Sequence, residues 1–213
     1  MRESIEVVTK ATATDIVSVA EMKTYLRIES SDDDTIIGTF IDSAVDAVQQ
    51  YLRRTLITST YRLTLDAIPR RSSEEWWDGM REGAVTELTG GDDYIILPMG
   101  PLLTVTSMTT YGTDNSGTVF AASNYFVDTA GDRLCLDYGA VWPTSLRDQA
   151  AIEIEYTAGY GASKTAVPGS IIQAVMKVAA KMYEDRGCDC MAELRNMETL
   201  SQYRRMDSLQ NGY

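Results

Sequence analysis

Residues 36–52 carry apolar side chains at intervals of three and four, the pattern of one face of a helix. Polar residues, among them Asp42, Asp46 and Gln49, occupy the positions between them. The pattern therefore predicts an amphipathic helix, whose apolar stripe consists of Ile36, Ile37, Phe40, Ile41, Ala44, Val45, Val48 and Leu52.

Three consecutive aspartates, Asp32, Asp33 and Asp34, precede this stripe. A calcium loop requires alternating oxygen ligands, a glycine at the sixth position and a glutamate at the twelfth, and this stretch has none of that order. Carboxylates do stabilise the positive end of a helix dipole. We therefore interpret the cluster as a helix start, with Ser31 or Asp32 accepting hydrogen bonds from the first turn.

Two further patterns flank this helix. Ser18 and Glu21 have the spacing of a capping box, which predicts a short helix ending near Leu26, after a weakly patterned N-terminal arm at residues 1–17. After residue 56 the period changes to two, which predicts a half-buried strand. Its two faces would be Ile57, Tyr61, Leu63 and Leu65 on one side and Thr58, Thr60, Arg62 and Thr64 on the other.

Short strand patterns separated by turn-forming residues fill residues 94–161 and predict an antiparallel sheet or small barrel. After Pro168 a second helical stripe runs from Ile171 to Met182, and its pattern ends near Gly187. Helices at both ends of a run of strands indicate an α+β fold.

Two segments do not fit this scheme. Residues 70–93 are polar and contain Trp76 and Trp77, which could form a binding tip or fold back onto the sheet. In the tail, residues 188–213, apolar residues recur strictly every third position from Cys188 to Leu209. In an α-helix such positions wind around the axis, so the tail is either a helix embedded among partner subunits or a frayed terminus.

Composition narrows the function. The formal charge of −12 argues against a protein that holds nucleic acid by neutralising phosphates. The odd count of 3 cysteines, without a signal peptide, indicates synthesis in a reducing cytoplasm. No stretch approaches the ~20 apolar residues of a membrane span. The 213 residues, 44% of them hydrophobic, suffice for one core domain with an appendage.

Candidate chemistry is sparse. The chain has no histidine, the commonest general base, and no phosphate-binding loop or nucleophile elbow. Cys188 and Cys190 alone cannot complete a zinc shell. Glu153 and Glu155 share a strand face and could in principle serve glycoside hydrolysis, although their alternation with apolar residues favours a solvated face. We therefore predict no catalytic, cofactor-binding or metal-binding residues and no cofactor.

The ordered set of these features resembles the head-tail connector, adaptor or head-completion, proteins of long-tailed bacteriophages. It comprises a Leu-Arg-Ile stretch at residues 26–28, the aspartate cluster before a helix, a Leu-Pro-x-Gly-Pro turn at 97–101, an Ala-Gly-Tyr-Gly strand exit at 158–161 and a Val-Pro helix that ends in Tyr-Glu-x-Arg. The resemblance covers residues 18–187, which we take as the connector core domain.

The resemblance implies a structural virion protein of the neck, not an enzyme. Such proteins form a ring, usually a dodecamer, between the portal protein and a tail-side neck or stopper protein, and DNA passes through the ring without specific binding. An acidic channel lining would let DNA slide. The C-terminal tail would reach the portal, which makes candidate portal contacts of Leu194, Met197, Leu200, Tyr203, Arg204, Arg205 and Met206.

The segment 70–93 departs from the pattern of the family because it is a longer insertion. We expect it to face the tail side or a neighbouring subunit, with Trp76 and Trp77 as anchors. Two other functions remain open at this point: a monomeric protein-binding module, and a small carbohydrate-active enzyme that uses Glu153 and Glu155.

Overall fold

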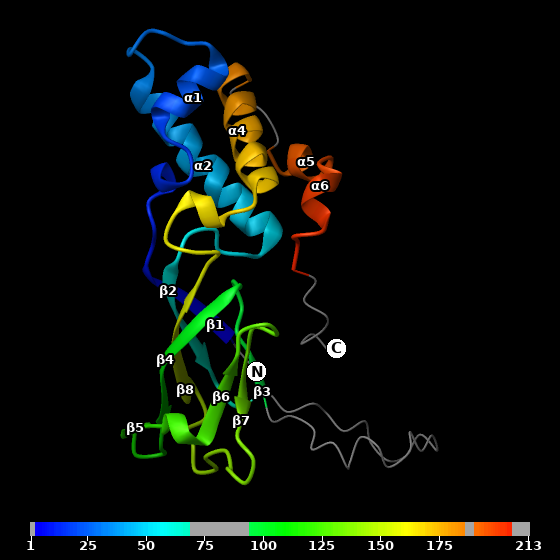
Figure 1. The fold of residues 1–213 in the computed structure, drawn as a ribbon. Helices are drawn as coiled ribbons and strands as arrows, with labels where there is room; N and C mark the ends of the chain where they lie inside the picture. Colours follow the sequence, from blue (N-terminus) through cyan, green and yellow to red (C-terminus); the bar gives the residue numbers. More distant parts are fainter. Residues whose placement is uncertain (1–2, 69–93, 186–189, 206–213) are drawn as a thin grey trace. The chain divides into compact units, whose positions relative to one another are not determined.

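The chain forms two compact units in the computed structural model, which describes residues 3–68, 94–185 and 190–205, and the side chains of 190 and 191 are outside that description (Figure 1). The sheet unit draws on residues 1–8, 60–97 and 102–157. The helical unit draws on residues 9–59, 98–101 and 158–213. This division differs from the predicted arm, core and tail, because each unit combines segments that are distant in sequence.

The helical unit is built on two long amphipathic helices, α2 (Asp34–Leu52) and α4 (Gly169–Glu184), which lie side by side. The short helix α1 (Val19–Leu26) packs against both of them. The α2 stripe is buried as predicted, with Ile41, Ala44, Val48 and Leu52 fully inaccessible. Both predicted stripes therefore meet in one core, which matches the α+β prediction for the helices.

The start of α2 confirms the helix interpretation of the aspartates but corrects the predicted cap. The residue before the helix is Asp33, and its side chain caps no amide. Asp32 instead accepts a hydrogen bond from the Ser30 hydroxyl at 2.7 Å, and Asp33 accepts one from the Tyr183 hydroxyl at 2.7 Å. Asp34 pairs with Lys23 at 2.8 Å. Each carboxylate thus has a separate partner, and Asp33 ties α2 to α4.

The sheet unit contains two sheets, one with strand order β1-β2-β8-β4-β5 and one with order β3-β7-β6. The pairs β4–β5, β3–β7 and β6–β7 are antiparallel. The strands are β1 (Glu3–Thr9), β2 (Ser59–Leu65), β3 (Tyr94–Ile96), β4 (Leu102–Tyr111), β5 (Gly117–Val119), β6 (Tyr125–Asp128), β7 (Arg133–Leu136) and β8 (Ile152–Ala158).

Strict alternation of buried and half-exposed residues defines the two central strands, β2 and β8. Tyr61 and Leu63 of β2 face inward, as predicted, and Tyr61 stacks on the fully buried Tyr156 with ring centroids 5.7 Å apart. Arg62 on the opposite face lies 3.9 Å from Glu155. The inner face of the five-stranded sheet therefore supplies the core of this unit, and the outer face is polar.

Two strands were not predicted. Residues 3–9 form β1, where we expected only a weakly patterned arm, and residues 117–119 form β5. Every residue of both strands is exposed. The period-two signal is weak in both strands, because β1 alternates only over residues 4–7 and β5 has only three residues.

The segment 70–93, with Trp76 and Trp77, lies outside the described residues, as does Cys188. Among the helices that the structure describes, none is both long enough and apolar enough to cross a bilayer.

Candidate functional site

An apolar pocket of about 640 Å³ opens beside α1 in the helical unit. Its walls come from the segment before α1, from α1 itself, from the short 3-10 helix η4 (Lys164–Ala166) and from α4. The lining residues are Ile16, Val17, Glu21, Thr24, Tyr25, Lys164, Thr165, Val167, Ile172 and Met176. Tyr25, one of these lining residues, is 45% exposed.

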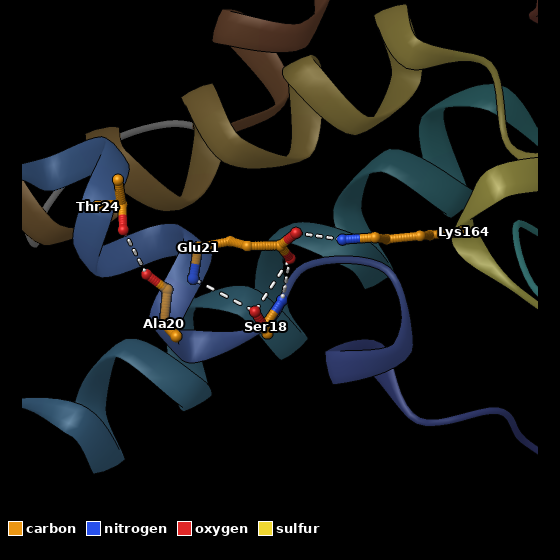
Figure 2. Close-up of polar contacts among 5 residues, drawn as sticks. All are labelled: Ser18, Ala20, Glu21, Thr24 and Lys164. Atoms are coloured by element: carbon orange, nitrogen blue, oxygen red, sulfur yellow. Dashed lines mark hydrogen bonds and ion pairs between the residues drawn. The ribbon is translucent and has the colours of Figure 1, made fainter.

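The capping box of α1 supports the rim of this pocket (Figure 2). The backbone amide of Glu21 donates to the Ser18 hydroxyl at 3.2 Å, and the Ser18 amide donates to the Glu21 carboxylate at 3.0 Å. The predicted capping box is thus confirmed. The other carboxylate oxygen of Glu21 accepts from the Lys164 ammonium, so the same side chain joins α1 to η4.

The hydrogen bond from Lys164, followed by those from Ser18, lowers the pKa of Glu21 from 4.5 to about 2. The carboxylate therefore stays charged at any pH the protein meets near neutrality. Both side chains are more than two-fifths exposed, which limits the stabilisation from this ion pair.

This arrangement suits the binding of apolar side chains from another protein, since the pocket offers apolar walls and one ion pair at its rim. Among the described residues, no three His, Cys, Asp or Glu side chains lie close enough together to hold a metal ion. Glu21 was predicted as part of the cap only. Its contact with Lys164 spans 143 positions and leaves no local signal in the sequence.

The predicted portal contacts of the tail lie largely inside the helical unit. Leu194 of α5 (Cys190–Arg195) and Leu200 of α6 (Glu198–Ser201) are fully buried, and Met197 and Tyr203 pack against the same core. Instead of one continuous helix, the described tail has two short helices, of which α5 contacts α2 and α4 and α6 contacts α4. That partner subunits surround the tail stays a prediction.

The three-residue interval of the tail does not follow one continuous helix. The amides of Met197, Leu200 and Tyr203 each donate to the carbonyl three residues earlier, at 3.0–3.1 Å. These bonds lie at the ends of two short α-helices, and Met197 between the helices has a ψ of 86°, which is not helical. The tail is therefore interrupted at Met197, and Leu194, Met197, Leu200 and Tyr203 all pack in the core of the helical unit.

The arginines of the tail also contact the chain's own α2. The Arg204 guanidinium lies 5.2 Å from the centre of the Tyr51 ring, and the Arg205 amide donates to the Leu52 carbonyl at 2.9 Å. Contact with a portal stays a prediction for these residues, and Leu194 and Leu200 could make it only by leaving their own core. Met206, Trp76 and Trp77 lie outside the described residues.

Glu153 and Glu155, the pair considered for glycoside hydrolysis, have separate partners on the outer face of the sheet. The Tyr111 hydroxyl donates to Glu153 at 3.0 Å, which raises the pKa of Tyr111. Glu155 faces Arg62. These contacts are those of a polar strand face, as the alternation indicated.

Comparison with known proteins gives two kinds of match. Residues 16–75 match the family described as phage gp6-like head-tail connector protein. No curated protein sequence matches the chain. The family match spans the capping box, the aspartate cluster, α1 and α2.

Solved structures match over almost the full length. A chain in the neck of the empty gene transfer agent (GTA) particle, computed with C6 symmetry, is 26% identical with a TM-score of 0.70, over 98% of both chains. A chain in the neck of the native GTA particle, computed with C12 symmetry, is 25% identical with a TM-score of 0.71, over 98% of both chains. A chain in the native GTA virion covers 97% of this chain and 98% of its own, at 25% identity and a TM-score of 0.68. The resemblance to the head-tail connector proteins is thereby confirmed.

Proposed function

We propose that this chain is a structural adaptor of the virion neck, which forms a ring between the portal and the tail and offers a docking platform and an exit channel for DNA. The observation that carries the proposal is the match of fold over 98% of the chain to neck proteins, combined with the connector match at residues 16–75. A ring agrees with the C12 and C6 symmetry of the two neck structures.

The charge of the chain supports a channel through which DNA slides. The net charge is −12, and a surface of that sign repels phosphates instead of holding them. In this proposal the protein performs no reaction and requires no cofactor. Its place is the head-tail interface, where twelve copies would be the expected stoichiometry.

The proposed partners are the portal protein on one side and a tail-side neck or stopper protein on the other. The tail would contact the portal through Arg204 and Arg205, whose charges suit portal carboxylates. The segment 70–93, with Trp76 and Trp77, would contact the tail side or a neighbouring subunit. The apolar pocket beside α1 is a further candidate surface for either partner.

Co-expression with the portal protein of the same genome tests this proposal. Native mass spectrometry of the purified complex should reveal a ring bound to the portal. Removal of residues 188–213 should abolish binding, but this truncation also deletes the buried Leu194 and Leu200. Circular dichroism must therefore show that the truncated chain is still folded.

The double variant Arg204→Glu/Arg205→Glu provides the matched test, since it leaves both buried leucines in place. We expect it to weaken portal binding and to leave the helical content unchanged. A wild-type chain that neither forms a ring nor binds the portal would contradict the proposal and favour a monomeric binding module.

A further inference from the structure

Strand β1 carries apolar side chains on a surface that nothing in the described chain covers. Ile5, Val7 and Val8 are exposed by 43%, 49% and 42%. A seven-residue strand that is exposed at every position is costly to leave in water when three of its residues are large and apolar.

The ion pair of Glu6 identifies the two faces of β1. Glu6 lies 3.5 Å from Arg62 of the neighbouring strand β2, and Arg62 also reaches Glu155 on the polar outer face. Successive side chains of a strand point to opposite faces. Ile5 and Val7 therefore lie on the inner face, the one on which Tyr61 and Leu63 of β2 are buried.

The inner face of the sheet is thus covered over β2 and uncovered over β1. Exposure rises from 0% at Leu63 to 49% at Val7 on the adjacent strand. Within the described ranges, β1 is also the terminal strand of its sheet, so its outer backbone edge pairs with no described strand. An apolar face next to an open strand edge is a typical site for association with another chain.

We propose that the inner face and outer edge of β1 form the contact with a second copy of this chain, in the ring that the proposed function requires. Neck chains of the same fold occur in particles computed with C12 and C6 symmetry. Each subunit of a closed ring contacts two identical neighbours through two different surfaces. The surface with Ile5 and Val7 is one of these two, and the neighbour contributes a different one.

The ring assembled by co-expression with the portal tests this inference. The variant Ile5→Thr/Val7→Thr keeps residues that favour strands but removes apolar surface, and Ile5→Asp/Val7→Asp adds charge at the same positions. We expect the protein concentration at which half of the chains are in rings to rise by at least ~10-fold for the aspartate variant and by less for the threonine variant. Val141→Asp is the matched control, because Val141 is 75% exposed in the same unit, and it should assemble normally.

A cysteine variant distinguishes a ring contact from a two-fold contact. In a chain with Cys188 and Cys190 changed to serine, Val7→Cys should form no disulfide with the same residue of another copy, because the ring contact joins different surfaces. Efficient Val7→Cys dimers would overturn the inference.

Failure of the inference about β1 can be distinguished from failure of the proposed function. If the wild-type chain forms portal-bound rings and the Ile5→Asp/Val7→Asp variant assembles equally well, the inference about β1 is wrong and the proposed function stands. If the wild-type chain forms no ring, both are wrong.

Discussion

The helical unit and the sheet unit differ in how far they bury the apolar side chains near the two ends of the chain. In the helical unit the tail is folded back, and Leu194 and Leu200 are buried in the same core as α2 and α4. In the sheet unit the N-terminal strand β1 leaves Ile5 and Val7 exposed. The end for which we predict portal contact packs two leucines into the chain's own core, and the end that we took as a weakly patterned arm presents apolar surface.

The largest difference between the two ends of the chain should come from shortening the side chain of a buried leucine in the tail. Leu200→Ala removes a fully buried side chain, which costs about 2–4 kcal/mol of unfolding free energy. Urea unfolding followed by far-ultraviolet circular dichroism measures this loss. Ile5→Ala in the monomeric chain is the contrasting variant, and it should change stability by less than about 0.5 kcal/mol. Equal losses in the two variants would mean that the tail is not part of the helical core.

A glycine substitution sharpens the description of the helical unit. Gly159 has a φ of +141°, and a Cβ there would lie 2.6 Å from the backbone nitrogen of Thr58. Gly159→Ala should therefore destabilise the chain by about 2–3 kcal/mol in the same urea experiment. Gly169→Ala is the control, since Gly169 begins α4 with open space around it. A tolerated alanine at 159 would show that the strand exit can move away from Thr58.

A buried carboxylate offers the equivalent test in the sheet unit. Asp132 is 8% exposed, and its side chain accepts a hydrogen bond from the Leu102 amide at 2.7 Å. Asp132→Ala leaves that buried amide without its acceptor and should cost about 1–3 kcal/mol, as measured by thermal or urea unfolding. Asp132→Asn keeps an acceptor and tolerates the positive φ of 53° at this position, so it should retain more stability. An asparagine variant as unstable as the alanine variant would contradict the role assigned to this hydrogen bond.

The smallest expected effect concerns the ion pair of Glu21. Glu21→Gln keeps a side chain that can complete the capping box but removes the charge that faces Lys164. We expect a loss of about 0.5 kcal/mol at neutral pH, because exposed pairs contribute little. The pKa of Glu21 is lower in the folded chain than in the unfolded chain, so the wild-type advantage exists above pH 4.5 and disappears as the pH falls toward about 2. Unfolding curves of both proteins across this range measure it, and a constant difference would contradict it.

The elements that were predicted correctly are those with strong local signals. The stripes of α2 and α4, the capping box of Ser18 and Glu21 and the alternation of β2 all reflect burial of one face, which the sequence records directly. The exposed strands β1 and β5 bury no face, and their alternation is too short to predict a strand.

Predictions from local sequence pattern were wrong where they assumed a backbone geometry, in the tail and at the start of α2. The tail was treated as one continuous α-helix, whereas its described part forms two short α-helices that are interrupted at Met197, where ψ is 86°. The cap of α2 was assigned to Ser31 or Asp32, but the partner of Asp33 is Tyr183, 150 positions away. Local sequence pattern also cannot predict contacts between distant segments, such as that of Glu21 with Lys164.

The attachment of the tail to the end of α2 has a mechanical consequence. The Arg54 side chain donates to the Tyr203 carbonyl at 2.7 Å, and the Arg205 amide donates to the Leu52 carbonyl at 2.9 Å. Tension applied to the chain beyond residue 205 would therefore act first on these two hydrogen bonds and through them on the last turn of α2. The tail would resist such a pull until both bonds broke, and only then would Leu200 and Leu194 be drawn from the core in turn.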